Sequence, residues 1–516
     1  MKAAAVIVLV ALAWPLARLD LGLAKVWPAI ASLVLVWLLR QPLPALLLGG
    51  FSGALALHAA DPWRALPEFL SVHVAGSLHS AWNSSALLFT LLMGGFVAVI
   101  DSGGGLSSLA RRWLERPGRD PARRVQNGAF AFGLACFFDG LANSMLVGRL
   151  FRPLFDRERV PRAMLAYIVD STSAPVACVA FISTWIAFQL SLIGAGFAAA
   201  GLEANPYTVF TASVPANFYC WFTLLLVFLA IRRSWRPGPM AEARPDSGTE
   251  GGAPAPVSAA WRGAVPVVFL VGAIFAGLYF DGAGGSLPGS VEDVARAFGA
   301  ADAARVLLWA SVLAAGLACA LHPRPQEAPA ALAQGMLSFV APASILLGAW
   351  ALGSVVKELE AADWIAGALQ GRMPPALLPA VVFAFAALTS FCTGTSWGTM
   401  GVVMPLALPG ALTLAVAAGA GPGEVFSTGA AVTAAVFSGA VFGDHCSPLS
   451  DTTIVSAAAS GVDTLEHVRT QLPYALAAAS AALLLGFLPL GFGLPAWLCL
   501  AVGALVLAAT VHRLSR

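Results

Sequence analysis

Long apolar runs fill most of the chain, and short polar segments separate them. A transmembrane α-helix needs about 17 to 25 mainly apolar residues to cross about 30 Å of hydrocarbon. A transmembrane β-barrel would instead show segments of about ten residues in which apolar and polar positions alternate. The runs here are continuous. The pattern therefore predicts an all-α polytopic membrane protein with about 12 transmembrane helices.

The expected spans follow the apolar runs along the chain. They lie near 4–17, 26–39, 44–60, 84–101, 163–190, 207–231, 263–281, 304–321, 334–353, 425–460, 473–492 and 495–512. Two further apolar segments, 127–148 and 376–418, are expected to be re-entrant hairpins. Each hairpin would enter the membrane as one short helix and return to the same side as another.

Composition excludes a soluble protein. Hydrophobic residues make up 59% of the 516 residues and charged residues only 11%, with a mean hydropathy of +0.80. Soluble domains carry about 25% charged residues. All seven cysteines lie in apolar stretches without a C-x-x-C pair, so we expect free buried thiols. The N-terminal apolar run lacks a small-residue cleavage site, so we expect it to be the first span.

The arginines predict the orientation, because cytoplasmic loops are enriched in Arg and Lys. Basic residues cluster in 102–126, in 149–162, from Arg232 onward and at the C-terminus. The first of these loops contains Arg111, Arg112, Arg116, Arg119, Arg123 and Arg124. Loops 61–83, 282–303 and 354–375 are poorer in Arg and are expected outside. Both termini are therefore expected in the cytoplasm.

The first hairpin follows from the same rule. Both loops that flank 127–148 are basic, but a single crossing helix would place one of them outside. A hairpin keeps both loops inside, with its tip near Asp139-Gly140-Leu141-Ala142-Asn143. Irregular backbone at that depth is tolerated only where it is buried in protein or lines a wet cavity. The tip is therefore a candidate site.

The order of spans and hairpin in the first half recurs in the second half with every direction reversed. This order predicts an inverted-topology repeat, which places ion and substrate sites near the midplane where broken helices meet. The expected units are N-terminal scaffold spans 1–83, first repeat core 84–231, cytoplasmic linker 232–262, second scaffold 263–333, second repeat core 334–492 and terminal span 493–516.

Four polar segments interrupt the apolar pattern, two in each half: 137–154, 166–177, 393–406 and 443–457. The second and fourth each combine Asp with Ser, Thr and Pro, and are expected to break a long span. Na⁺ is a hard cation that prefers carboxylate, hydroxyl and carbonyl oxygens. A carboxylate in low dielectric has a raised pKa, so it can hold either a proton or a cation.

The candidate ion- and proton-binding residues are Asp139, Asn143, Asp170, Ser171, Thr172, Thr393, Ser396, Asp444, His445, Ser447, Asp451 and Thr452. Asp170 and Asp451 are the candidate Na⁺ ligands. A Ser or Thr in a membrane helix is more often a packing residue than a ligand. An intramembrane Asp costs several kcal/mol, which favours a functional role. His445 fits a structural role and a proton-handling role equally.

Two long motifs resemble the NhaC-type Na⁺/H⁺ antiporter family, within the ion-transporter superfamily. FGDHCSPLSDTTIVSAAASGVDTLEHVRTQLPYAL, residues 442–476, is similar to the C-terminal signature of that family. VGRLFRPLFDRERVPRAMLAYIVDSTSAPVA, residues 147–177, is similar to its first-half signature. The resemblance covers about residues 84–480. Family members carry Asp-Asp-Tyr-Ala-Asn at the first tip, whereas this chain has Asp139-Gly140-Leu141-Ala142-Asn143, which leaves stoichiometry and substrate open.

The resemblance implies a secondary transporter of the bacterial plasma membrane that exchanges Na⁺ for H⁺ by alternating access. The family also includes carriers of organic acids, so coupled transport of a small organic acid or amino acid is the alternative. The chain has no H-E-x-x-H or G-x-S-x-G pattern, so no enzyme is expected. The expected partners are lipid, monovalent cations and protons, with a small organic anion and a homodimer left open. No nucleic acid and no cofactor beyond the transported ions is expected.

Overall fold

The structure is a computed structural model that describes residues 2–105, 108, 120–245, 258–284, 291–370 and 372–515. Every regular element in these ranges is a helix, and ten of the helices are long and apolar enough to cross a membrane. Four shorter apolar segments lie in 3–18, 23–39, 42–57 and 186–199. The all-α membrane architecture is confirmed, whereas the number of twelve spans stays a prediction. Arg111, Arg112, Arg116, Arg119 and residues 246–257 of the linker lie outside the described residues.

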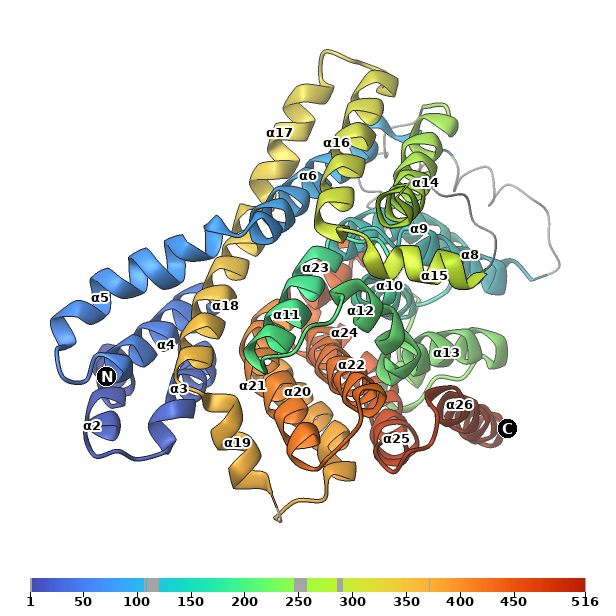
Figure 1. Cartoon of the computed structure of the whole chain (residues 1–516). Coiled ribbons are helices and arrows are strands. Elements are labelled where there is room, and N and C mark those ends of the chain that lie inside the picture. The colour runs from blue at the N-terminus through green and yellow to red at the C-terminus, as the bar shows by residue number, and fades with distance from the viewer. Residues whose placement is uncertain are drawn as a thin grey trace.

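The N-terminal helices lie together on one side of the molecule, far from the C-terminus (Figure 1). They are α1 (Lys2–Ala11), α2 (Ala13–Arg18), α3 (Leu23–Leu39), α4 (Pro42–Leu57) and α5 (Ala65–Glu68), followed by the π-helical turn η2 (Phe69–Ala75) and the 3₁₀ turn η3 (Gly76–His79). The long helix α6 (Ala81–Gly103) comes next and packs against α16 (Ala303–Leu321) and α17 (Ala328–Ser338). Ser80 caps α6 by accepting a hydrogen bond from the Asn83 backbone N–H.

The first predicted hairpin is broken at its predicted tip. Helix α8 (Pro121–Ala135) ends before Asp139, and α9 (Gly140–Arg157) begins directly after it. The two helices pack against each other. The Asp139 backbone is extended, and its side chain caps α9. A single unbroken crossing helix over 127–148 is thereby excluded, while the depth of this hairpin in a membrane stays a prediction.

The long span of the first half breaks at a different place from the one expected. Helix α10 (Arg162–Val179) runs unbroken through Asp170 and Pro175, and the break lies in 180–185, before α11 (Ile186–Ala199). The expectation that 166–177 interrupts the helix is therefore wrong. The helix stays intact because its hydroxyl groups find partners without opening the backbone. The Ser171 and Ser173 hydroxyls bond to other elements, and the Thr172 hydroxyl bonds back to its own helix.

The second half has the same helix–break–helix order. Helices α20 (Leu378–Thr393) and α21 (Ser396–Ala417) meet at Gly394-Thr395, where Thr395 has extended backbone and caps α21 as Asp139 caps α9. Helix α22 (Pro422–Cys446) then breaks in 447–450, before α23 (Asp451–Ser460). The break predicted in 443–457 is confirmed.

The remaining helices flank these two halves. They are α12 (Pro206–Ser213), α13 (Phe218–Arg233), α14 (Trp261–Ala283), α15 (Val291–Ala300), α18 (Val340–Glu358), α19 (Ala361–Leu369), α24 (Thr464–Ala481), α25 (Leu488–Gly491) and α26 (Ala496–Leu514). Whether the expected domain boundaries hold stays a prediction.

Each half packs one helix against the hairpin of the other half. Helix α23 packs against α9, and α11 packs against α21, so each helix after a break contacts a hairpin of the other half. A glycine at each of these two contacts lets the helices come close together. A Cβ added at Gly148 would lie 2.6 Å from the Ala459 Cβ, and one at Gly196 would lie 2.5 Å from Leu408 Cδ2. Small residues at helix contacts are typical of membrane proteins, because packing drives helix association there.

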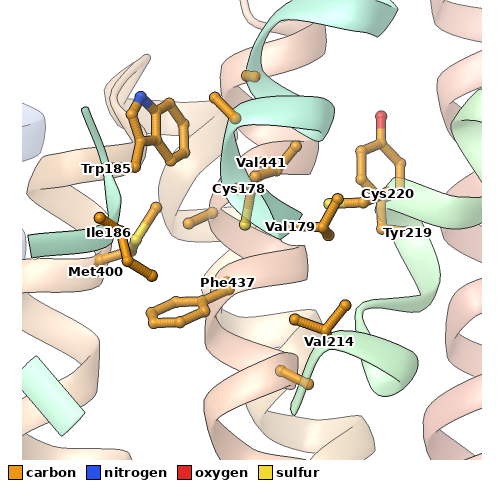
Figure 2. Close-up of a cluster of buried hydrophobic side chains, with 14 of the residues drawn as sticks. Cys178, Val179, Trp185, Ile186, Val214, Tyr219, Cys220, Met400, Phe437 and Val441 are labelled. Atoms are coloured by element: carbon orange, nitrogen blue, oxygen red, sulfur yellow. The ribbon is translucent and has the colours of Figure 1, made fainter. Parts of the chain in front are cut away.

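Helix α22 lies at the centre of the core. In its most apolar window, 72% is buried, against 22% for the peripheral α26. Phe437 and Val441 of α22 stand among Cys178 of α10, Cys220 of α13 and Met400 of α21 (Figure 2). Polar groups on α10 and α22 are therefore shielded on several sides by apolar side chains.

Candidate functional site

Asp170 is the centre of a buried polar cluster. It is fully buried on α10, a helix in which every residue is buried. Its Oδ2 accepts from Gln471 Nε2 at 2.8 Å and from Thr453 Oγ1 at 3.4 Å, and lies 3.1 Å from His467 Nε2. Its Oδ1 accepts from Ser456 Oγ at 3.3 Å. Helices α10, α23 and α24 thus meet at one carboxylate.

His467 and Gln471 keep unused polar atoms inside this cluster. Both side chains are fully buried and lie one helical turn apart on α24. Within the described residues, His467 Nδ1 and the Gln471 amide oxygen have no hydrogen-bond partner. Gln471 Nε2 also donates to the His445 carbonyl oxygen, so it joins Asp170 to the end of α22. Buried polar atoms without partners are rare and mark places where a ligand or water can bind.

Asp444 is a second buried carboxylate, directly before the break after α22. It accepts from Ser450 Oγ at 2.6 Å and from Ser396 Oγ at 2.9 Å. Ser396 begins α21, so this bond joins the second hairpin tip to the second break. The Asp444 carbonyl accepts from Thr452 Oγ1 at 3.2 Å and from Thr453 Oγ1 at 2.9 Å. Thr453 therefore contacts both Asp170 and Asp444.

His445 connects the halves through side-chain hydrogen bonds. Its Nε2 lies 2.9 Å from Ser171 Oγ on α10, and its Nδ1 lies 2.7 Å from the Tyr219 hydroxyl on α13. All three side chains are buried. The ring nitrogens are both occupied, and the hydroxyls can donate or accept at either one. This arrangement can pass a proton along Tyr219, His445 and Ser171.

Asp139 and Asn143 hold the first hairpin tip. Asp139 Oδ1 accepts from the Ala142 N–H at 2.7 Å, and Oδ2 accepts from Thr184 Oγ1 at 2.9 Å in the break after α10. Asn143 Nδ2 donates to the Gly133 and Thr172 carbonyls at 2.8 and 2.6 Å, whereas Asn143 Oδ1 has no partner within the described residues. A free amide oxygen of this kind could ligate a cation.

Four predicted site residues either bond only within their own segment or are exposed. Thr172 and Thr393 donate back to carbonyls of their own helices, at 2.8 Å in each case. Ser447 accepts from the Leu449 N–H at 3.3 Å within the break. Asp451 begins α23 with an exposed side chain, unlike Asp139, Asp170 and Asp444. The structure therefore brings Asp170, Ser171, Asp444, His445, Ser396 and Thr452 into one connected network and leaves these four outside its centre.

Six residues of this network were not predicted from the sequence: Ser144, Tyr219, Thr453, Ser456, His467 and Gln471. One feature of the sequence pointed to two of these residues. His467 and Gln471 are two polar residues at i and i+4, which places them on one face of α24. A polar face on a helix of a membrane protein points to a protein interior or a wet cavity.

No Arg or Lys forms an ion pair with Asp170 or Asp444 in the described part of the chain, where His467 is the basic partner of Asp170. The surroundings of both carboxylates are hydroxyl, amide and imidazole groups. No group of three His, Cys, Asp or Glu residues there is placed to hold a metal ion such as zinc. Hydroxyl, amide and imidazole groups of this kind can exchange a proton with a carboxylate or supply oxygen ligands to a cation.

Comparison with known sequences decides the family. The sequence profile of the Na⁺/H⁺ antiporter family matches residues 176–492, which include both breaks of the second half and the His467–Gln471 pair. The chain belongs to the Na⁺/H⁺ antiporter family. This antiporter-family protein is a multi-pass membrane transporter and not an enzyme, and the predicted NhaC-type relationship agrees with the match.

Several proteins are similar to this chain over all or part of its length. A Haemophilus influenzae protein described as uncharacterized is 29% identical over 95% of this chain and 96% of its own length. The malate-2H⁺/Na⁺-lactate antiporter of Bacillus subtilis is 37% identical over 25% of this chain and 24% of its own. The arginine/ornithine antiporter of Halobacterium salinarum is 39% identical over 19% of each chain.

Two solved structures share the fold of this antiporter-family protein. The YdaH transporter of Alcanivorax borkumensis superposes with a TM-score of 0.55 at 16% identity, over 85% of this chain and 90% of that one. MtrF of Neisseria gonorrhoeae, described among antimetabolite efflux pumps, gives 0.55 at 14% identity, over 86% and 84%. At these identities the likeness concerns the fold alone.

Proposed function

We propose that the protein exchanges Na⁺ for protons across the membrane by alternating access, with Asp170 as the carboxylate at which the two ions compete. The observation that carries this proposal is the fully buried Asp170–His467 contact of 3.1 Å, set among hydroxyl and amide groups. One carboxylate and one imidazole can share a single proton. The pair is neutral overall while it holds that proton and carries one negative charge when the proton leaves.

A sodium ion can replace that proton. With Na⁺ at Asp170, His467 no longer faces an unbalanced carboxylate and can lose its proton. The hydroxyls of Thr453 and Ser456 now donate to Asp170, and rotation of each would turn a lone pair toward the ion. Simultaneous binding of both cations is disfavoured, because each would bring a positive charge into a low-dielectric core. Competition for one site is the simplest form of antiport.

The interface between the halves supplies a way to expose this site alternately. Ser456 Oγ lies 3.0 Å from Ser144 Oγ on α9 and 3.3 Å from Asp170 Oδ1 on α10, and its single proton can be donated to either, so the charge state of Asp170 acts directly on the contact between α9 and α23. The contact between α11 and α21 is its counterpart in the other half. Rigid-body movement of one repeat against the other is typical of transporters built from inverted repeats.

Proton release on Na⁺ binding tests the proposal without any membrane. Purified protein in weakly buffered detergent solution is titrated with NaCl, and with choline chloride as a matched salt, while a pH dye reports free protons. We expect Na⁺ to release protons from the wild type and not from Asp170→Asn. Na⁺ binding without proton release in the wild type would reject competition at one site.

The alternative is coupled transport of a small organic acid or amino acid. The names of the malate-lactate and arginine/ornithine antiporters support it, although each match covers a quarter or less of either chain. At the first tip this chain has Gly140 and Leu141, where relatives of the NhaC type carry Asp and Tyr. This difference also supports the alternative. We further propose a bacterial plasma membrane location with both termini in the cytoplasm, from the distribution of Arg along the chain.

A further inference from the structure

The first residues of the linker fold back onto the helices. Directly after α13, Ser234 has a left-handed backbone with φ of 52°, and the Trp235 N–H bonds to the Ala230 carbonyl at 3.0 Å. A left-handed residue of this kind ends many helices and reverses the direction of the chain. The 3₁₀ turn η5 (Gly238–Ala241) follows and packs against α24. Residues 234–243 therefore form a strap that lies on α24.

Two buried side chains anchor the strap. Trp235 and Met240 have 8% and 0% of their surface exposed, whereas Ser234 and Ala241 beside them are exposed. The Tyr474 hydroxyl of α24 donates to the Trp235 carbonyl at 2.9 Å, and the two rings meet edge to face with centroids 5.2 Å apart. A segment with two anchors and one short turn can detach at low cost, because few buried contacts favour local opening.

Stacked aromatic rings lie between the strap and the Asp170 network. Tyr474 stacks on Tyr167 of α10, with ring centroids 4.1 Å apart, and both rings are buried. Tyr167 lies one helical turn before Asp170 on α10. Tyr474 lies one turn after Gln471 on α24, and Gln471 donates to Asp170 at 2.8 Å. A path from the strap to Asp170 therefore passes this pair of tyrosines.

The Tyr167 hydroxyl is an unused polar group on that path. It lies near Ser171, one turn further along α10, but forms no hydrogen bond of normal geometry within the described residues. A buried hydroxyl without a partner is costly, and water is the partner that most often satisfies such a group. Ser171 Oγ in turn lies 2.9 Å from His445 Nε2. Water entering beneath the strap would meet Tyr167, Ser171 and His445 in that order.

We propose that the strap is a gate over the Asp170 network on the side of the linker, with Tyr474 as the positioning residue that holds the gate closed. The proposal rests on the cation and proton exchange proposed above and adds the route by which the ions reach the site. The linker is expected in the cytoplasm, so this is the cytoplasmic route. When Trp235 detaches, Tyr474 loses its hydrogen bond and its edge-to-face contact, and water can reach its stack on Tyr167.

Thiol labelling of a cysteine within the strap tests the gate without transport. The seven native cysteines are replaced, Met240→Cys is added, and the full chain in detergent reacts with excess maleimide. Position 240 is fully buried, so labelling requires the strap to open. Tyr474→Phe keeps the ring stack but removes the hydroxyl, and we expect it to speed labelling about fivefold, as for loss of one typical hydrogen bond.

Tyr207→Phe on α12 is the matched control for Tyr474→Phe. The Tyr207 hydroxyl also donates to a backbone carbonyl, that of Phe181 at 3.4 Å, in a hydrogen bond that does not involve the strap. In the same background, Tyr207→Phe should therefore be labelled at the rate of Met240→Cys alone.

The effect of Na⁺ on labelling tests whether the gate responds to the ion site. We expect saturating NaCl, compared with choline chloride, to slow labelling of Met240→Cys about threefold or more, because an occupied site has to be closed before the halves move. Asp170→Asn in the same background should show no difference between the two salts.

A cross-link tests the gate during transport and decides the matter if Met240→Cys does not fold. A Cβ added at Gly238 would lie 3.3 Å from Pro473 Cγ of α24, so Gly238→Cys combined with Pro473→Cys should form a disulfide. Oxidation of this pair in proteoliposomes should slow Na⁺/H⁺ exchange at least tenfold, and reduction should restore the rate. Oxidation should leave each single variant unchanged.

The proposal would be overturned if folded Met240→Cys protein were not labelled, or if Tyr474→Phe were labelled no faster than Tyr207→Phe. Undiminished exchange in the oxidised pair would also reject it. Failure of the proposed exchange gives a different result. In that case Na⁺ would release no protons from the wild type and would not change the labelling rate, while Tyr474→Phe would still speed labelling.

Discussion

At the scale of single residues, the proposed exchange depends on the side chains that surround Asp170. Its burial and its role as a candidate were predictable, because an acid in a long apolar run is costly without a function. Its partner His467 was not, because it comes from α24, 297 positions away along the chain. The same holds for Ser171 and His445, which were separate candidates until the structure placed them 2.9 Å apart.

His467→Gln tests the pair at this scale. Glutamine keeps a hydrogen-bond donor toward Asp170 but cannot carry a proton, so the fold should persist while Na⁺/H⁺ exchange falls to background. The measurement is Na⁺-dependent proton flux across a range of pH, with the unfolding temperature as a check on folding. His79→Gln, on the turn before α6, is the matched control and should leave the flux unchanged. Normal flux in His467→Gln would remove the imidazole from the mechanism.

At the scale of elements, the helix breaks were partly predictable. The tip at Asp139 and the break after Asp444 lie where they were expected, because Gly, Pro and short polar residues cluster there. The break after α10 lies at 180–185 and was missed, since its sequence, Ala-Phe-Ile-Ser-Thr-Trp, is mostly apolar. Conversely, the polar run around Asp170 stays helical because its hydroxyls find partners without opening the backbone.

Gly148→Ala tests the contact between α9 and α23. The new Cβ would lie 2.6 Å from the Ala459 Cβ, so one helix has to move. We expect a loss of stability of about 1–3 kcal/mol, as in other overpacked contacts, together with slower exchange. Gly272→Ala on α14 is the control, because nothing lies within 4 Å of its added Cβ. That variant should keep or raise the unfolding temperature.

At the scale of the whole molecule, the sequence predicted the membrane class and the order of helices and breaks in the second half, and it misplaced the second break of the first half. It did not predict that each half inserts a helix against the hairpin of the other, because that contact depends on small residues far apart in sequence. The hydrophobic pattern also does not determine the number of spans, since four apolar segments are shorter than a typical span.

Cross-linking the halves tests whether this interface moves. Ser144 Oγ and Ser456 Oγ lie 3.0 Å apart, so cysteines at both positions should be close enough to form a disulfide. The seven native cysteines would first be replaced. Oxidation of the double variant should stop exchange, and reduction should restore it, if α9 and α23 separate during transport. Each single variant controls for loss of the hydroxyl. Undiminished exchange in the oxidised protein would show that the movement lies elsewhere.

The central claim is that one buried carboxylate carries Na⁺ and H⁺ in turn. Its most direct test is the pH inside proteoliposomes under an imposed Na⁺ gradient, for wild type, Asp170→Asn and Asp463→Asn. Asp463 is an exposed cap of α24, and Asn caps equally well, so it removes an acid without touching the site. We predict Na⁺-driven pH change in wild type and Asp463→Asn and none in Asp170→Asn. Equal pH change in all three proteins would show that the ions do not compete at Asp170.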